Sequence, residues 1–429
     1  MRIWLAAFTS IVAFAGDGAM VTFNRDVVPI LKKHCQSCHR PGQIAPMSFL
    51  TYGETRPWAK AIRTAVVSKK MPPWFADDQY GHFANDPSLN QSEVRTLVAW
   101  AESGAPEGDP PEGDPKDFPP PVQRASGAWQ IPPDHVVSLP AYRVPAKGTV
   151  EWTYFTVPSG FANDQWVTSI EILPSDPSVV HHAAIFIQPH RASVRYGEPT
   201  TDDPVRGAGS IQAVYVPGCN AMDYRRYGAA KFIRAQSDLV VQMHYTPKGQ
   251  EVTEAIRIGF TVAKERPHRR FVTYSPQSPA ILNREIFRIP AGDPNWESPV
   301  VEGKFNVDAE RVWFMPHMHL RGKDMTYVVT YPDGSSEILL RVARYNPAWQ
   351  LGYDVASPIK VPKGAKLHVA AHYDNSANNH WNPDPSTNVY GGTQDWEEMM
   401  VPFFGVVVDS GVDPRKVMTL PGQIGPGGG

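Results

Sequence analysis

Cysteine is scarce in this chain: its 429 residues include three, at positions 35, 38 and 219. Two of them form one Cys-x-x-Cys unit, so the fold cannot depend on a set of disulfides. An excess of one charge is missing as well, because 41 lysines and arginines are balanced by 43 aspartates and glutamates. This balance provides no basic surface for nucleic acid or for an anionic membrane. We therefore expect no nucleic-acid partner.

Long hydrophobic runs are also missing: the run from Ile3 to Ala15 is shorter than the roughly 20 apolar residues that a membrane-spanning helix needs. It follows Arg2, and the small residues Ala13 and Ala15 match a signal-peptidase site. We expect residues 1–19 to be an export signal, no stable membrane span, and a periplasmic or extracellular protein. A single membrane anchor is the alternative interpretation of this run.

Proline and glycine are abundant, with 43 and 33 residues, which is typical of a turn-rich β protein. Residues 20–106 do not follow this β pattern, because the segments that begin at Phe23 and Asn90 carry apolar residues at helical spacing. Asn90 is a suitable N-terminal cap for the second helix, and Gly104 is a suitable stop. Residues 20–106 therefore predict a small all-α domain, and the Pro-rich segment 107–129 predicts an extended linker.

Beyond the linker the period of apolar residues changes to two, which predicts β strands. A tight turn is expected at YPDGSS, residues 331–336. So many short strands favour two tandem all-β sandwiches, jelly-roll-like, over residues 130–270 and 271–412, with a flexible tail at 413–429. The predicted strands are EWTYFTV, WVTSIEIL, VVHHAAIFI, DLVVQMHYT, IRIGFTV, RVWFMPHMHL, MTYVVTY, EILLRVA, KLHVAAHY and VPFFGVVV.

Residues 35–39 read CQSCH, the motif that attaches haem c covalently. The thiols of Cys35 and Cys38 can form thioethers to the vinyl groups, and His39 can ligate the iron. A zinc site would need four ligands, and a thioredoxin-like site would need a βαβ unit that the sequence lacks. We therefore expect residues 20–106 to be a c-type cytochrome domain.

The second axial ligand of this haem is predicted to be Met71, in KKMPPW. Prolines fix the backbone after it, and the next tryptophan can pack on the ring. Met47 follows His39 too closely to reach the opposite face without strain. His82 is the third candidate, but we expect both His34 and His82 to be surface histidines.

Two further stretches pair histidines: HHAAIF at 181–186 and PHMHL at 316–320. His317 and His319, two apart on a strand, would present both imidazoles on one face. The adjacent His181 and His182 would point to opposite faces of a regular strand, so a shared ion requires a β-bulge or the use of different ring nitrogens. Taken alone, either pair is more often structural than metal-binding.

Taken in order, these segments resemble the copper type II, ascorbate-dependent monooxygenases, the family of peptidylglycine α-hydroxylating monooxygenase and dopamine β-monooxygenase. The resemblance spans roughly residues 130–410. It implies two β-sandwiches side by side, each holding one copper ion. The implied ligands of the first copper are His181, His182 and, in VVQMHYTP, His244; those of the second are His317, His319 and, in YGGTQDWEEM, Met399.

The family's chemistry implies that the methionine-ligated copper uses O2 to hydroxylate a C–H bond, while the all-histidine copper supplies the second electron across a wet cleft. A small organic substrate and O2 are then the expected partners. We expect electrons to come from an external donor, ascorbate or another reductant, through the fused haem domain. The alternatives are a non-catalytic periplasmic haem and copper electron-transfer protein, and a ligand-binding sandwich module with a cytochrome fusion.

The chain departs from the peptide-processing members of the family at the substrate. Met315 stands where those enzymes have an arginine that clamps a carboxylate, and Val401 and Phe403 stand where they have Asn and Tyr. These differences predict a less polar substrate than a peptidyl-glycine. His368 and His372 match no metal motif and are expected to be structural or to support a ligand.

Overall fold

The computed structural model describes residues 20–109, 128–191, 194–204, 211–219, 221–276 and 279–420. The predicted export signal, residues 110–127 of the predicted linker and residues 421–429 of the predicted tail lie outside the described residues. No helix within the described ranges is long and apolar enough to cross a membrane.

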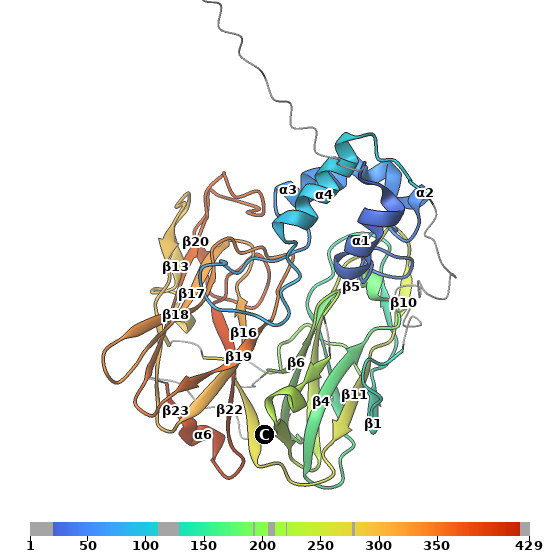
Figure 1. Cartoon of the computed structure of the whole chain (residues 1–429). Helices are drawn as coiled ribbons and strands as arrows, with labels where there is room; N and C mark the ends of the chain where they lie inside the picture. Colours follow the sequence, from blue (N-terminus) through green and yellow to red (C-terminus); the bar gives the residue numbers. More distant parts are fainter. Residues whose placement is uncertain are drawn as a thin grey trace, which may run out of the picture.

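Residues 20–109 form a helical region with its own core at one end of the molecule (Figure 1). Leu31, Leu97 and Trp100 are fully buried there. The predicted cap is confirmed, because the Asn90 side chain accepts a hydrogen bond from the Glu93 N–H at 2.9 Å. The helices are η1 (Phe23–Val27), α1 (Val28–His34), α2 (Tyr52–Thr55), η2 (Arg56–Trp58), α3 (Ala59–Val67) and α4 (Gln91–Glu102).

The rest of the chain is mostly β, and its largest sheet has nine strands. Their order is β1 (His135–Ser138), β11 (Arg257–Val262), β4 (Gln165–Leu173), β8 (Ala229–Ile233), β12 (Arg269–Tyr274), β22 (Val401–Asp409), β16 (Ala309–His317) and β19 (Tyr353–Val361), with β7 (Met222–Asp223) paired to β4.

Two further sheets complete the main body (Figure 1). The first has four strands, β3 (Thr153–Pro158), β9 (Ser237–Tyr245), β5 (Val180–Pro189) and β6 (Ile211–Tyr215). The second has six, β18 (Ser336–Val342), β17 (Gly322–Thr330), β20 (Lys366–Tyr373), β15 (Val301–Phe305) and β23 (Met418–Thr419), with β14 (Trp296–Glu297) paired to β20.

Short elements connect these sheets. They are the strand pairs β2 (Tyr142–Val144) with β10 (Val252–Glu254) and β13 (Arg288–Ile289) with β21 (Val389–Tyr390), and the helices η3 (Pro177–Val179), η4 (Tyr224–Tyr227), α5 (Pro279–Leu282) and α6 (Pro414–Val417).

The β body has two hydrophobic cores that share strand β22. Because successive side chains of a strand point to opposite faces, Val401 and Phe403 of β22 pack into the core built mainly from residues 139–271. Phe404 and Val406 pack into the core built mainly from residues 272–418. One strand therefore supports both halves.

The nine-stranded sheet crosses the predicted boundary between the halves. Strand β12 contains residues 270 and 271, the two sides of that boundary. It pairs in parallel with β8 of the first half and antiparallel with β22 of the second half. The backbone hydrogen bonds of this sheet therefore run from one half to the other. The predicted domain boundary at residue 270 does not separate the sheets, and in this respect the prediction is wrong.

All ten predicted strands overlap observed strands, and the predicted turn at 331–336 is confirmed by a hydrogen bond from the Tyr331 N–H to the Ser335 carbonyl at 2.8 Å. The predicted tail begins too early. Residues 413–420 include α6 and β23, and Met418 is 4 % exposed. Its methyl group packs so tightly against Gly303 that a Cβ on this glycine would lie 2.6 Å from it.

A strap of residues 74–86, between α3 and α4, attaches the helical region to the second half. The Asp77 N–H donates to the Arg341 carbonyl at 2.8 Å, and the Ala84 N–H donates to the Asp354 carbonyl at 2.7 Å. Trp74 packs against Tyr353 with ring centroids 4.7 Å apart. The helical region is therefore docked on the β body and not only joined to it through residues 107–129.

Arg311 is an unusual member of the second core. Its side chain is fully buried, and its nitrogens have no hydrogen-bond partner among the described residues. Burial lowers its pKa to about 9, and the guanidinium lies 4.5 Å from the Phe404 ring centroid. Such cation–π contacts offset only part of the cost of burying a charge.

We expect Arg311→Met to raise the free energy of unfolding by about 1 kcal/mol or more, because a well-packed apolar group replaces a desolvated charge. Urea denaturation measures this change. The exposed Arg344 provides the control, since Arg344→Met should change stability by less than about 0.5 kcal/mol. A large loss of stability in Arg311→Met alone would contradict the prediction.

Candidate metal centre

Three histidines of the first half converge on one point. His181 and His182 lie on β5, and His244 lies opposite them on β9. The Nδ1 atom of His181 is 3.2 Å from Nδ1 of His182 and 3.3 Å from Nδ1 of His244. The β5–β9 pairing shifts register between Val180 and His182. The bulge that adjacent histidines need to share an ion is therefore present.

The outer ring nitrogens explain how these imidazoles are oriented. His181 donates its Nε2–H to the Ala348 carbonyl at 2.9 Å, which leaves the Nδ1 lone pair directed into the cluster. His244 Nε2 lies 3.5 Å from Asp395 Oδ2. Burial lowers the pKa of both histidines to about 4, so both are neutral at pH 7. The outer nitrogen of His182 is buried and has no hydrogen-bond partner among the described residues. Three converging imidazoles, two of them with an acceptor at the outer nitrogen, suit a copper ion.

A second histidine pair lies at the end of β16. The strand ends at His317, so the expectation that His319 also lies on the strand is wrong; the chain turns there. The two rings still lie 5.3 Å apart. His317 Nδ1 donates to Gln350 Oε1 at 2.7 Å, and His319 Nδ1 donates to the Glu397 carbonyl at 3.2 Å. Both Nε2 atoms therefore carry the free lone pair.

The second pair is also buried and neutral. Burial lowers the pKa of His319 to about 3 and lowers that of His317 as well. His319 Nε2 is buried and has no hydrogen-bond partner among the described residues. An unpartnered lone pair in this position is consistent with metal binding. Met399, which precedes β22, lines the same cavity as His317.

Glu398 holds these candidate ligands in place. The carboxyl group is fully buried, and burial raises its pKa to about 8. It accepts hydrogen bonds from the backbone N–H groups of His319 at 2.9 Å, Met399 at 3.3 Å and Arg321 at 2.5 Å. Glu398 therefore orients the chain around Met399 and is not solvated.

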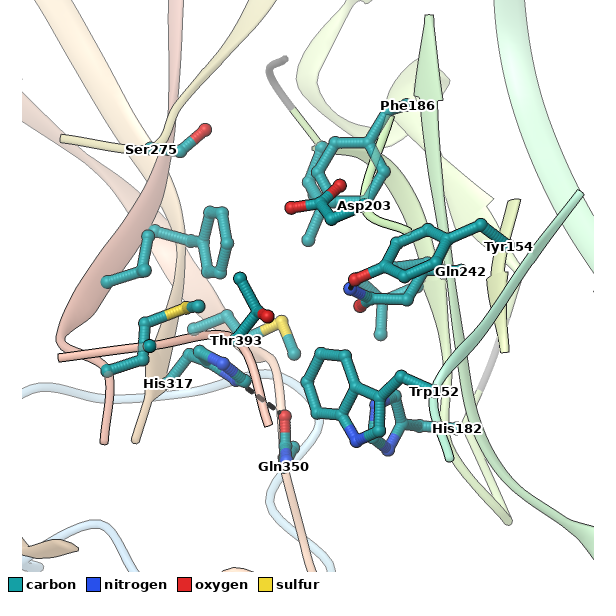
Figure 2. Close-up of a pocket in the computed structure, with 18 of the residues that line it drawn as sticks. Trp152, Tyr154, His182, Phe186, Asp203, Gln242, Ser275, His317, Gln350 and Thr393 are labelled. Atoms are coloured by element: carbon teal, nitrogen blue, oxygen red, sulfur yellow. Dashed lines mark hydrogen bonds between the residues drawn. The ribbon is translucent and has the colours of Figure 1, made fainter. Parts of the chain in front are cut away.

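Trp152 lies between the two histidine groups (Figure 2). Its ring centroid is 5.2 Å from His182, 6.1 Å from His317 and 5.5 Å from His319. The indole N–H donates to Asp395 Oδ1 at 3.1 Å, and the other oxygen of Asp395 faces His244. An indole therefore lies between the two groups, beside cavities that border both of them. The open, wet cleft that the resemblance implied stays a prediction.

A cavity of about 420 Å³ adjoins His182, His317 and Met399. This volume suits a small organic molecule. Apolar side chains form most of its wall. Tyr154 and Gln242 add polar groups, and the Tyr154 hydroxyl accepts a hydrogen bond from the Gln242 amide at 2.8 Å (Figure 2). The apolar side chains of this wall include Phe186, Ile211, Met315, Val401 and Phe403. Met315, Val401 and Phe403 are the three positions at which the chain departs from the peptide-processing enzymes.

The haem-motif residues gather around the end of α1. Cys38 lines a separate cavity of about 180 Å³ between the helical region and both β halves. Its sulfur approaches Gly218 so closely that a Cβ there would lie 2.7 Å away. Burial raises the pKa of Cys35 to about 12, so the thiol is neutral. His39 stacks on Phe49 with ring centroids 4.3 Å apart, and its buried Nδ1 has no partner among the described residues.

Two thiols and a nearby imidazole with one unpaired ring nitrogen fit covalent attachment of haem. The predicted axial ligand Met71 does not line the cavity beside Cys38, whereas Pro72, Pro73 and Trp74 do. Met71 therefore stays a prediction. The expectation that His34 is a surface residue is wrong, because its side chain is 6 % exposed and bonds both Pro87 and Glu93.

Comparisons with known proteins add little. No protein-family model matches the chain, and no curated protein matches it significantly. Among solved structures, the crystal structure of peptide-N(4)-(N-acetyl-beta-D-glucosaminyl) asparagine amidase is similar, with 10 % sequence identity and a TM-score of 0.24. The match covers 66 % of this chain and 93 % of that chain. A likeness this low carries no argument about function.

Proposed function

We propose that this protein is an exported copper-dependent monooxygenase that hydroxylates a C–H bond of a small organic substrate. O2 is the proposed oxidant, and the electrons arrive through an N-terminal c-type cytochrome domain. The observation that carries the proposal is the convergence of three imidazole nitrogens in the first half, together with a second histidine pair whose rings lie 5.3 Å apart and whose cavity Met399 also lines. These are the residues on which the family resemblance rests.

In the proposed architecture, residues 20–106 bind haem c and two tandem jelly-roll-like sandwiches each bind one copper ion. The first copper would be held by His181, His182 and His244, and the second by His317, His319 and Met399. The second ion supplies O2 activation and oxygen insertion when bound, and the first supplies an electron. Cys35 and Cys38 would attach the haem, with His39 and Met71 as its axial ligands.

The protein's own groups have definable tasks in this proposal. Gln350 holds the His317 tautomer in which Nε2 is free to bind metal. Glu398 fixes the backbone at His319 and Met399 through hydrogen bonds. The apolar wall of the 420 Å³ cavity can place an apolar substrate group beside His317. Tyr154 and Gln242 offer hydrogen bonds to a polar part of the substrate.

The proposal is tested first by metal content. The purified holoprotein should bind two copper ions per chain, and their cupric electron-spin spectrum should show nitrogen coupling. Chelation of both ions should abolish O2 consumption with a reductant while the haem absorbance remains, because the haem is attached covalently. One copper per chain or none, after reconstitution, would contradict the proposal.

A non-catalytic electron carrier is the second candidate, and the ring contacts of Trp152 with both histidine groups favour it. Such a carrier would exchange electrons between haem and copper but would make no hydroxylated product. Mass spectrometry of small apolar test compounds incubated with protein, reductant and 18O2 separates the two functions, since only a monooxygenase incorporates one labelled atom.

A further inference from the structure

We propose that the loop of residues 347–352 is the internal electron connection between the haem side of the molecule and the two histidine groups, with Gln350 as the residue that positions it. This inference rests on the proposed function. It assigns a role to a segment that contains none of the candidate ligands.

The loop borders the haem side directly. Trp349, Gln350, Leu351 and Gly352 line the 180 Å³ cavity into which Cys38 also points. The strap contributes Trp74 and Asn85 to the same cavity. Asn85 fixes the end of the loop, because its amide donates to the Gly352 carbonyl at 2.8 Å and its side-chain oxygen accepts from the Asp354 N–H at 2.8 Å.

The other side of the loop holds one histidine of each group. The Ala348 carbonyl accepts the hydrogen bond from His181, and Gln350 Oε1 accepts the hydrogen bond from His317. These two contacts join a single loop to both candidate copper sites. The loop itself is held by the hydrogen bond from the Ala348 N–H to Asn346 Oδ1 at 3.0 Å.

Gln350 lies between the haem side of the loop and the side that faces the histidines. It is 5 % exposed. It lines the cavity beside Cys38, the 420 Å³ cavity beside His317, and a third cavity beside His181 and His319. A path from Cys38 to His317 therefore crosses the cavity that Cys38 and Gln350 both line, then the Gln350 side chain and its 2.7 Å hydrogen bond to His317. The bonded part of this path is a better electronic connection than a gap through solvent.

The transfer itself is simple to balance. One electron leaves a ferrous haem held at Cys35 and Cys38, which becomes ferric, and it reduces a cupric ion at the histidines to the cuprous state. No bond forms or breaks, and no proton needs to move. The docked strap means that the loop makes this connection without a swing of the helical region.

The test uses the full-length holoprotein with haem and cupric copper, under anaerobic conditions and without substrate. A sub-stoichiometric pulse of a one-electron reductant reduces the haem, and its reoxidation by copper is followed by absorbance. Gln350→Leu removes the acceptor oxygen without adding a metal ligand, and Gln350→Glu retains an acceptor. Gln188→Leu, a half-buried glutamine near the end of β5, is the matched control.

We expect haem reoxidation to slow at least about tenfold in Gln350→Leu, as outer hydrogen-bond partners of metal ligands typically contribute 10- to 100-fold. Gln350→Glu and Gln188→Leu should stay near the wild-type rate. Copper content and the electron-spin spectrum report separately whether His317 still binds metal. Equal rates in Gln350→Leu and wild type, with copper retained, would overturn the loop assignment alone.

Two other outcomes are also decisive. If Gln350→Leu loses copper, Trp349→Leu replaces it as the test, because Trp349 lines the Cys38 cavity and has no hydrogen bond to a histidine. A slower rate in Trp349→Leu supports the route, and an unchanged rate rejects it. If the wild-type haem never passes an electron to copper, the haem-donor part of the proposed function fails together with the inference.

Discussion

Met399→Ala is expected to lower O2 consumption and product formation more than about 100-fold, because changes to outer partners of metal ligands already cost 10- to 100-fold. The thioether is the soft ligand that favours a cuprous, O2-reactive ion. Haem absorbance and metal binding by His181, His182 and His244 should not change, since Met399 belongs to the other group.

The matched control for this change is Met222→Ala, which removes a half-buried thioether on β7 that lines the cavity beside Cys38 but not the cavity that His317 and Met399 share. It should leave O2 consumption within about twofold, because it removes no ligand. Oxygen uptake with a small reductant and copper analysis measure both variants. Unchanged uptake in Met399→Ala would end the monooxygenase assignment and leave the electron carrier.

Trp152→Ala is expected to lower the free energy of unfolding by about 3–5 kcal/mol, the usual cost of removing a buried tryptophan. The indole is 3 % exposed and touches imidazoles of both groups. Its loss also leaves the half-buried Asp395 without its hydrogen-bond donor. We therefore expect slower electron exchange between the two coppers in addition to lower stability.

Trp152→Phe separates the two effects. It retains an aromatic ring between the histidine groups but removes the N–H that Asp395 accepts. Its stability should lie between those of wild type and Trp152→Ala in urea denaturation, while electron exchange stays closer to wild type. The exposed Trp396, 52 % accessible, is the control for loss of a tryptophan. Equal stability of Trp152→Ala and wild type would contradict the packing described above.

The candidate histidine ligands could be proposed from sequence because they lie in short patterns on strands or, as His319 does, just after one. Two adjacent histidines, or two separated by one residue, can be recognised without knowledge of the fold. The residues that hydrogen-bond to these histidines or pack against them cannot be recognised in this way. His181 meets Ala348 across 167 residues, and Trp152 meets Asp395 across 243. No local spacing links such pairs, because tertiary packing alone brings them together.

The strands were predictable for a similar reason. Alternating apolar residues in segment 366–373 indicate a strand with one buried face, and the continuous apolar run 401–408 indicates a strand buried on both faces. The pairing of β8 with β12 could not be predicted from the sequence. Parallel neighbours in one sheet can come from distant segments, and no repeated pattern of residues links them. The buried end of the chain was missed because β23 has two residues, too few for a period.

The continuous ladder through β8, β12 and β22 has a consequence for metal loading. Strand β12 pairs with β8 at two residues and with β22 at six, so a hinge between the two halves would have to break these backbone hydrogen bonds. We therefore expect the distance between the two histidine groups to be fixed when the chain folds. The proposed copper ions would then enter sites that are already formed.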